Sequence, residues 1–320
     1  MAKIRVAVLR GGPSAEYEIS LMTGENVLKF LPKDKYQAHD VLISKDGVWH
    51  MDGFPTDPAK IFRRVDAVFN ALHGEYGEDG IVQQILEGHK IPYTGSGILA
   101  SAMAMKKNIA KDVYKNAWLK TPRGITLKKT ANIKESVRDI NETLFPPWII
   151  KPVGRGSSVG VAIAKTVPDI GPALEKAFSY DNEALAEEFI SGRETTCGVL
   201  ENFRGSKYYA LPVIEIIPPD GFFFDYKVKY NGETKEICPA HLDSKISEEI
   251  QNMSIAAHSA LGLCHYSRSD FIVSKRGIYI LETNTLPGLT SESLLPKASE
   301  AVGLSFPNLL DHLVSLALEK

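Results

Sequence analysis

The chain has 320 residues, a formal net charge of −2, 44% hydrophobic residues and 24% charged residues. This is the composition of an ordinary globular protein with room for about two or three domains, and the small net charge excludes a broad basic surface for nucleic acid. Three widely spaced cysteines disfavour a disulfide framework or a zinc site and are typical of a reducing cytosol. The N-terminal apolar run is too short for a signal peptide, and no stretch approaches the ~20 apolar residues of a membrane span. We therefore expect a cytoplasmic protein that binds neither nucleic acid nor a membrane.

Strands and helices alternate over the first third of the chain. The sequence predicts, in chain order, a strand at 4–9, a helix at 14–31 capped by Ser14, strands at 38–43 and 67–72, a helix at 79–88 and a short strand around Tyr93. Such alternation is typical of an open parallel sheet covered by helices.

The rest of the chain alternates less regularly. The sequence predicts a helical stretch at 100–117, a strand at 146–152 with a hairpin partner at 161–164, a helix at 173–178 and a strand at 184–190, then a β-rich region and a final helix from about Asn308. Asn231-Gly232 lies between alternating residues and predicts a further hairpin.

Two polar residues follow strand ends in the N-terminal region. His73 ends the third predicted strand in a glycine-rich turn, and Glu16 follows the first strand in the first turn of its helix. Parallel α/β sheets bind ligands at the carboxyl ends of their strands, so both side chains are candidates for a ligand site. A structural histidine and a carboxylate that stabilises a helix dipole remain the alternatives.

A segment rich in glycine and serine, 154–160, lies between two predicted strands and just after Lys151. Backbone N–H groups can converge on an anion in such a segment, and a lysine adds a positive charge. The spacing differs from that of a P-loop, and Gly11-Gly12 does not complete a dinucleotide-binding motif. The alternative is a flexible hairpin tip.

Two further segments suit a nucleotide. Glu187 and Glu194 flank the predicted strand end at 188–190, where backbone groups could bind a base and a carboxylate could bind a ribose. Residues 220–232 could form a lid that carries Lys229 and Tyr230 over a reacting site and excludes water. A plain strand with a solvated turn and an ordinary hairpin are the respective alternatives.

Glu282 and Asn284 lie two residues apart at the end of a predicted strand that begins at Gly277, so they share one face of it. A second predicted strand opens with Asp270, and the turn at 275–277 joins the two strands as a hairpin. Two carboxylates and an amide oxygen suit Mg²⁺ that also holds substrate phosphates. The alternative is a set of solvated side chains at a strand end.

Together these segments resemble the D-alanine–D-alanine ligase family of the ATP-grasp superfamily, nearly from end to end. Any one motif is weak, but seven motifs in this order are specific. In chain order they are Gly11-Gly12-Pro13-Ser14-Ala15-Glu16, Leu72-His73-Gly74 with Gly77-Glu78-Asp79-Gly80, Tyr93-Thr94-Gly95-Ser96-Gly97, Lys151-Pro152 with Gly156-Ser157-Ser158-Val159-Gly160, Asp225-Tyr226 with Lys229-Tyr230, Ser267-Arg268-Ser269-Asp270, and Glu282-Thr283-Asn284-Thr285-Leu286-Pro287-Gly288-Leu289-Thr290-Ser291.

The resemblance implies an α/β protein, α+β in parts, with ATP-grasp architecture. An N-terminal open parallel α/β domain at 1–97 would be followed by two α+β lobes, at 98–186 and 187–320, that clasp the nucleotide. The implied activity is ATP-dependent ligation of two D-alanines through an acyl phosphate, which makes a precursor of the bacterial cell wall. The implied cofactors are ATP and two Mg²⁺ ions, for which Mn²⁺ could substitute. The substrates are D-alanine and ATP, and a homodimer is expected.

The resemblance also assigns residues to ATP and metal. Lys107 and Lys151 would bind the phosphates, Glu187 and residues 188–190 the adenine, and Glu194 the ribose. The full set implied for ATP is Lys107, Lys151, Ser158, Glu187, Glu188, Phe189, Ile190, Glu194 and Lys229. The metal ligands would be Asp270, Glu282 and Asn284.

The implied substrate residues come from both ends of the chain. Glu16 would hold the ammonium of the first D-alanine, with His73 near its carboxylate, while Ser293 and Leu294 would receive the carboxylate of the second. The catalytic set would be Glu16, Ser157, Tyr230, Arg268, Gly288 and Ser293. In that set Arg268 and the Gly288 N–H would stabilise the oxyanion, and Ser157 and Tyr230 would connect with Glu16.

The chain departs from the family pattern in two places. Val153-Gly154 replaces more polar residues, which could alter the stiffness of the loop, and Glu188 stands where a lysine is common, which could alter ATP affinity. A ligase of the same fold that takes D-lactate or D-serine second is the closest alternative. A non-catalytic nucleotide-binding module is disfavoured by the intact metal and arginine set, and a dehydrogenase by the missing glycine motif.

Overall fold

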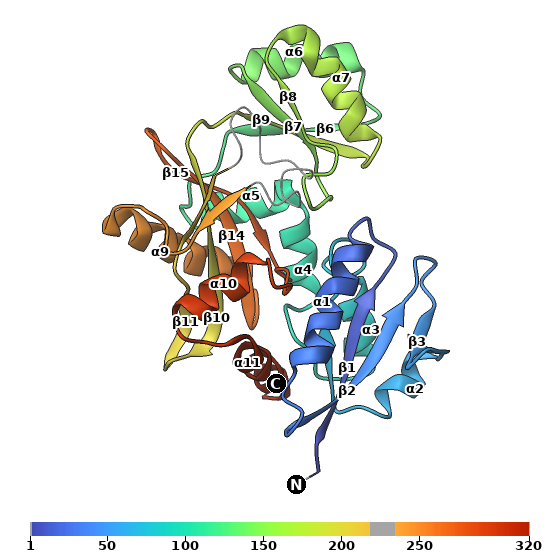
Figure 1. Ribbon diagram of the computed structural model, residues 1–320. Coiled ribbons are helices and arrows are strands. Elements are labelled where there is room, and N and C mark those ends of the chain that lie inside the picture. Colours follow the sequence, from blue (N-terminus) through green and yellow to red (C-terminus); the bar gives the residue numbers. More distant parts are fainter. Residues whose placement is uncertain (1, 218–233, 320) are drawn as a thin grey trace.

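The computed structural model describes residues 2–217 and 234–319, and within them the strands form three sheets (Figure 1). The three sheets follow one another along the molecule, and helices pack against each of them. This mixed architecture confirms the predicted fold class. The boundaries expected between 97 and 98 and between 186 and 187 stay predictions.

The N-terminal sheet confirms the predicted parallel strands. β1 lies between β2 and β5 and runs parallel to both, whereas β3 and β4 extend the far edge antiparallel. Tyr93 forms an isolated parallel bridge to Val68. The elements of this part are β1 (Ile4–Gly11), α1 (Tyr17–Phe30), β2 (Tyr36–Ile43), β3 (Trp49–Met51), β4 (Phe54–Pro55), α2 (Pro58–Phe62), β5 (Ala67–Asn70) and α3 (Ile81–Gly88).

β1 is central because its run of apolar residues, 6–9, is fully buried. The strand ends at Gly11, whose φ is +85° and where a Cβ would stand 2.4 Å from the carbonyl oxygen of Ile43. Only glycine tolerates both conditions. The turn that it permits leads directly to Glu16 at the start of α1.

Three of the predicted helices differ from the observed ones. The helix predicted at 173–178 already begins at Val167, as α7 (Val167–Phe178). The helix predicted from Ser14 begins at Tyr17 with Glu16 as its N-cap residue, and the Ser14 hydroxyl instead accepts a hydrogen bond from the Glu16 N–H at 3.0 Å in the turn before it. The stretch at 100–117 forms two helices, α4 (Ile98–Met105) and α5 (Lys107–Asn116), because the backbone of Lys106 is extended.

The middle sheet has the strand order β6-β9-β7-β8. The predicted hairpin is confirmed, with Trp148 opposite Ala164. Ile149 pairs with Glu187 on the neighbouring strand, so Lys151, two residues further along, lies on the same face as Ile149. The elements are β6 (Gly124–Lys128), α6 (Ile133–Thr143), β7 (Trp148–Pro152), β8 (Ala162–Ala164), α7 (Val167–Phe178) and β9 (Glu183–Glu188).

The third sheet has the order β13-β12-β10-β14-β15 with β11 paired to β10. The β14–β15 hairpin is confirmed, and Asp270 lies opposite Glu282. The prediction of a β-rich region up to Asn308 is wrong in part, because α9 and α10 lie within it. The elements are β10 (Arg193–Phe203), β11 (Ser206–Ala210), β12 (Ile214–Ile217), β13 (Lys235–Ile237), α9 (Ser244–Ala260), β14 (Tyr266–Ser274), β15 (Gly277–Asn284), α10 (Leu294–Ala301) and α11 (Phe306–Leu318).

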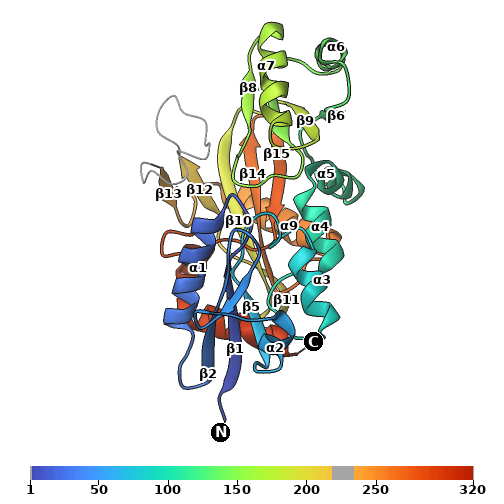
Figure 2. The same ribbon diagram turned by 90° about the vertical axis from the view of Figure 1, so that its right-hand side faces the viewer.

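The two ends of the chain share one hydrophobic core. Val8 and Phe69 of the N-terminal sheet pack in the same buried cluster as Leu310 and Leu313 of α11. Figures 1 and 2 both show α11 lying against the N-terminal part, while the sheet with α6 and α7 occupies the opposite end of the molecule. This packing brings the turns of the N-terminal sheet close to the end of β15.

The hairpin expected at Asn231-Gly232 and the lid expected at 220–232 lie outside the described residues. Among residues 2–217 and 234–319, no single helix is long and apolar enough to cross a membrane; α10 and α11 would pass that test only as a pair bent by 103°.

Candidate active site

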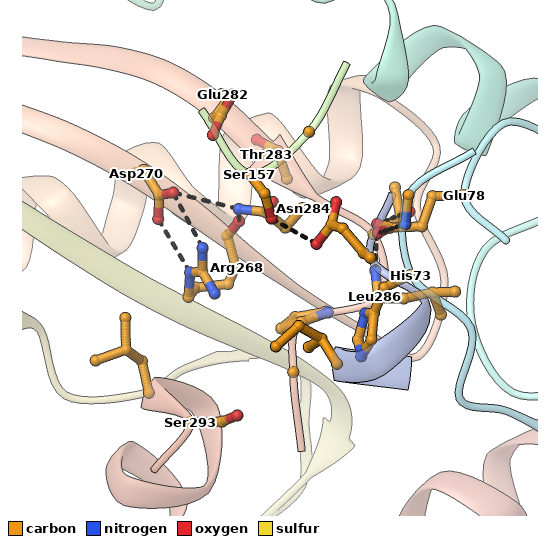
Figure 3. Close-up of a pocket in the computed structure, with 18 of the residues that line it drawn as sticks. His73, Glu78, Ser157, Arg268, Asp270, Glu282, Thr283, Asn284, Leu286 and Ser293 are labelled. Carbon is orange, nitrogen blue, oxygen red and sulfur yellow. Dashed lines mark hydrogen bonds and ion pairs between the residues drawn. The ribbon is translucent and has the colours of Figure 1, made fainter. Parts of the chain in front are cut away.

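Two cavities meet at the β14–β15 strand pair. The larger, about 550 Å³, lies between the ends of the N-terminal strands, the glycine-rich segment 154–160, β14, β15 and the segment that follows β15 (Figure 3). The smaller, about 110 Å³, lies between β7, β9 and the same two strands. Lys107, Asp270 and Glu282 line both cavities, so ligands in the two cavities can come into contact there.

The structure sorts most of the predicted site residues between these cavities. The larger is lined by Glu16, His73, Ser157, Arg268, Asn284, Gly288, Ser293 and Leu294. The smaller is lined by Lys151, Ser158, Glu187, Glu188, Phe189, Ile190 and Glu194. The predicted roles of Lys229 and Tyr230 lie outside the described residues and stay predictions.

The N-terminal side of the larger cavity presents a carboxylate and a neutral imidazole. Glu16 Oε2 accepts a hydrogen bond of 2.6 Å from the hydroxyl of Ser157, which joins the N-terminal part to the glycine-rich segment. His73 is 4% exposed, and its Nε2 lies 2.8 Å from the hydroxyl of Thr23. Burial lowers the pKa of His73, so the ring is uncharged at neutral pH and can still donate one hydrogen bond.

A second contact fixes the glycine-rich segment on the N-terminal part. The guanidinium of Arg155 forms an ion pair with Glu75 and also donates to the carbonyl of Tyr180 at 2.7 Å. A Cβ at Gly156 would stand 2.6 Å from a carboxylate oxygen of Glu16, so any larger residue here would displace that carboxylate from its present position. The ion pair and the missing side chain together seat Ser157 on Glu16.

The metal-ligand candidates gather around Asp270, as Figure 3 shows. Its carboxylate accepts from Arg268 at 3.0 and 3.1 Å, from the Thr196 hydroxyl at 2.6 Å and from the Asn284 amide at 3.3 Å. Glu282 lies opposite on β15, and one of its oxygens is 3.6 Å from Lys107 Nζ.

This donor set fits a divalent cation of the Mg²⁺ type. Two carboxylates and an amide on adjacent strands offer hard oxygen ligands beside a cavity large enough for phosphates. Among the described residues no group of three His, Cys, Asp or Glu side chains gathers in a metal-binding arrangement, so the site depends on these two carboxylates and on the amide.

The smaller cavity has a buried ion cluster at its base. Glu187 is 3% exposed, and Lys151 Nζ lies 2.5 Å from its Oε2, while Lys111 donates to its Oε1. Burial would raise the pKa of Glu187, but the two ammonium groups outweigh burial and hold the pKa below its ordinary value. Glu187 is therefore ionised beside the cavity.

Two predicted residues have structural contacts that their motifs did not reveal. The carboxylate of Glu188 accepts from the Arg123 N–H at 3.0 Å and from Arg276 at 3.1 Å, so this departure from the family pattern is neutralised by an arginine. The hydroxyl of Ser293 accepts a hydrogen bond of 2.9 Å from the Thr290 N–H, and Ser293 is the N-cap residue of α10.

Four residues of the site were missed by the sequence reasoning. Lys111 follows Lys107 by one helical turn, a spacing that could have been read from the sequence. Glu78 belongs to one of the family motifs, and its half-buried carboxylate accepts from the N–H groups of Gly74 and Leu286, both at 3.0 Å. Glu75 and Arg155 gave no signal, because only the fold brings them together.

The fold and the paired cavities define an ATP-grasp ligase, and comparison with known proteins gives the family. The model of the D-ala D-ala ligase C-terminus matches residues 114–315, and that of the N-terminus matches residues 5–59 and 52–96. The chain belongs to the D-alanine–D-alanine ligase family. It is an ATP-dependent ligase that joins D-alanine to D-alanine.

Relatives match over the whole chain. A D-alanine–D-alanine ligase of Syntrophobacter fumaroxidans is 42% identical over 99% of this chain and 98% of its own length, and one of Desulfotalea psychrophila is 42% identical over 99% and 96%. Among solved structures, the VanG D-Ala:D-Ser ligase of Enterococcus faecalis superposes with a TM-score of 0.86 at 32% identity, covering 99% of this chain and 100% of that one. The D-alanine–D-alanine ligase of Coxiella burnetii gives 0.85 at 28% identity, over 100% and 95%.

The Glu75–Arg155 ion pair can be tested by exchanging its charges. A partly exposed pair contributes up to about 1 kcal/mol and like charges repel similarly, so Glu75→Arg or Arg155→Glu alone should lower kcat/KM for D-alanine about 5- to 30-fold. The variant with both charges exchanged should recover at least half of the transition-state stabilisation, calculated from kcat/KM, that the single variants lose. Arg138→Glu, an exposed change on α6, should have no effect. Steady-state kinetics at low salt measure these values, and a double variant that is as poor as the product of the single losses would remove the pair from the site.

Proposed function

We propose that the two cavities divide the ligation between them. The smaller cavity binds ATP, the larger binds both D-alanines, and phosphoryl transfer takes place where they meet. The observation that carries this proposal is that Lys107, Asp270 and Glu282 line both cavities. A γ-phosphate that enters from one side and a carboxylate that enters from the other would come together at these residues.

ATP would be held by complementary charge and by backbone groups. Lys107 and Lys151 bind its phosphates, with Ser158 of the glycine-rich segment beside them. Burial lowers the pKa of Lys107, while the neighbouring Glu282 opposes that shift and favours its charged form. Glu187 and residues 188–190 receive the adenine, and Glu194 receives the ribose.

Asp270, Glu282 and Asn284 would hold two Mg²⁺ ions, or Mn²⁺ in their place, and these ions would supply positive charge to the transferring phosphoryl group. Arg268, which lies against Asp270, adds a fixed guanidinium on the side of the larger cavity. Lys229 would contribute a further positive charge.

The first D-alanine would bind with its ammonium on Glu16 and its carboxylate near His73. The neutral imidazole adds no positive charge that would neutralise the attacking carboxylate. The carboxylate of the second D-alanine would bind at Ser293 and Leu294, where the first N–H groups of α10 favour an anion. Ser157 and Tyr230 would connect Glu16 with the glycine-rich segment and the lid.

The reaction then proceeds in two steps. A carboxylate oxygen of the first D-alanine attacks the γ-phosphorus, the bond to the β-phosphate oxygen breaks, and ADP leaves behind an acyl phosphate. The amine of the second D-alanine, once deprotonated, attacks the acyl carbon, and phosphate leaves as the peptide bond forms. Arg268 and the Gly288 N–H stabilise the oxyanion of the tetrahedral intermediate, which forms when the amine attacks and breaks down when phosphate leaves. The homodimer expected from the family resemblance and the cytoplasmic location expected from the composition stay predictions.

The function is tested by product analysis. With ATP, Mg²⁺ and D-alanine, the protein should release one ADP and one phosphate for each D-alanyl-D-alanine, and L-alanine should not replace the D-isomer. D-serine and D-lactate, offered in competition as second substrates, should give minor products only. Phosphate release without dipeptide would contradict the proposal, and a preference for D-serine or D-lactate would favour the alternative ligase.

Glu282 is the residue whose charge the proposed chemistry needs most. Replacement by glutamine keeps its size but removes the charge, so Glu282→Gln should lower kcat at least about 100-fold, as expected when metal-borne stabilisation of several kcal/mol is lost. Its melting temperature should stay close to that of the parent protein. Glu142→Gln, exposed on α6, is the matched control and should keep full activity. A Glu282→Gln protein with near-normal turnover would exclude Glu282 from the metal site.

A further inference from the structure

Lys111 is a buried lysine that lies next to the smaller cavity without lining it. It is 3% exposed and sits on α5, one turn after Lys107. A buried ammonium is costly unless it is paired, so its surroundings should explain its presence.

All three donors of the Lys111 ammonium are used by protein acceptors. One goes to Oε1 of Glu187, one to the carbonyl of Pro122 at 2.6 Å and one to the Thr121 hydroxyl at 3.2 Å. An ammonium has three N–H groups, so Lys111 has none left for a ligand. Its effect on a nucleotide must act through these partners.

Two of the three partners do line the cavity. Pro122 and Glu187 are part of its wall, as is Lys151, whose Nζ contacts the other oxygen of Glu187 at 2.5 Å. Glu187 therefore has one lysine on each carboxylate oxygen. Lys111 has no donor left for a ligand, whereas Lys151 lines the smaller cavity.

The different positions of the two lysines determine how Glu187 would be paired when ATP phosphates enter the cavity. Phosphates would attract Lys151 toward them, and a buried carboxylate that is left without a partner is strongly destabilising. Because Lys111 stays on Oε1, Glu187 remains paired when Lys151 moves. Without Lys111, Glu187 would hold Lys151 back from the phosphates.

We propose that Lys111 is a positioning residue for ATP: it anchors Glu187 in the cavity wall and thereby leaves Lys151 available to the phosphates. This inference rests on the proposed use of the smaller cavity for the nucleotide. It assigns Lys111 a role in nucleotide affinity and none in binding D-alanine.

The test compares Lys111→Met with the parent protein and with Lys115→Met, which removes an exposed lysine from the same helix. Lys111→Met should raise KM for ATP about tenfold or more, as expected when a partner of a buried charge is lost. KM for D-alanine should change less than about twofold. Lys111→Arg should restore most of the ATP affinity, and Lys115→Met should behave as the parent.

A second set of variants, built on Glu187→Gln, distinguishes a positioning role of Lys111 from a general loss of structure. Glu187→Gln alone should raise KM for ATP, and adding Lys111→Met to it should raise KM little further, because the carboxylate that Lys111 anchors is gone. The double variant has no carboxylate at position 187 that could hold Lys151 back, and Lys151 lines the cavity, so it tests the role even if Lys111→Met alone does not fold.

Three results would overturn the inference. They are an unchanged KM for ATP in folded Lys111→Met, an equal rise in both KM values, and a full additional loss on the Glu187→Gln background. Titration with Mg²⁺–ADP measures the same affinities without turnover. If the parent protein fails to make dipeptide, the proposed function fails, and the ADP titrations still decide the role of Lys111.

Discussion

The pairing of Asp270 with Glu282 across β14 and β15 is the constraint on which the rest of the site depends. The hairpin register places both carboxylates at the wall that the two cavities share. Like charges on facing strands repel, and the structure offsets this by setting Arg268 against one and Lys107 against the other. The same charges that make the pair tolerable surround the point where phosphate and carboxylate would meet. The same four charged side chains therefore stabilise the strand pair and provide the charges that the proposed reaction uses.

Contacts between distant parts of the chain complete the site. Glu78 accepts from the Leu286 N–H and the Thr285 hydroxyl, both at 3.0 Å, and so ties the turn after β5 to the end of β15. Burial raises the pKa of Glu78, and these hydrogen bonds oppose the rise, which is how this carboxyl is accommodated. The hydrophobic core that α11 shares with the N-terminal sheet further stabilises the contact between these two parts of the chain. Together these contacts hold Glu16 and His73 over the strand pair.

The elements that could be predicted from the sequence are those that a local residue pattern determines. Period two and the turn at 275–277 were enough to predict the hairpin, and hence the proximity of Asp270, Glu282 and Asn284, which the structure confirms. α9 was missed although Ile246, Ile250, Met253 and Ala257 recur at helical spacing and Asp243 caps it, so that signal was available. The contacts of Lys111 and Arg155 could not be predicted in this way. Their partners lie 76 and 80 residues away in the sequence, and no local pattern indicates such contacts. The family resemblance supplied the residue roles, which geometry alone could not have assigned.

We expect a D-alanine carboxylate to attack the γ-phosphorus at the shared wall of the two cavities. Isotope transfer tests it most directly: D-alanine labelled with ¹⁸O in its carboxyl group is turned over with unlabelled ATP, and the released phosphate is analysed by mass. Each phosphate should carry one ¹⁸O atom, because the carboxylate oxygen that attacks phosphorus leaves with it. Unlabelled phosphate formed in step with dipeptide would contradict the acyl phosphate and, with it, the arrangement proposed here.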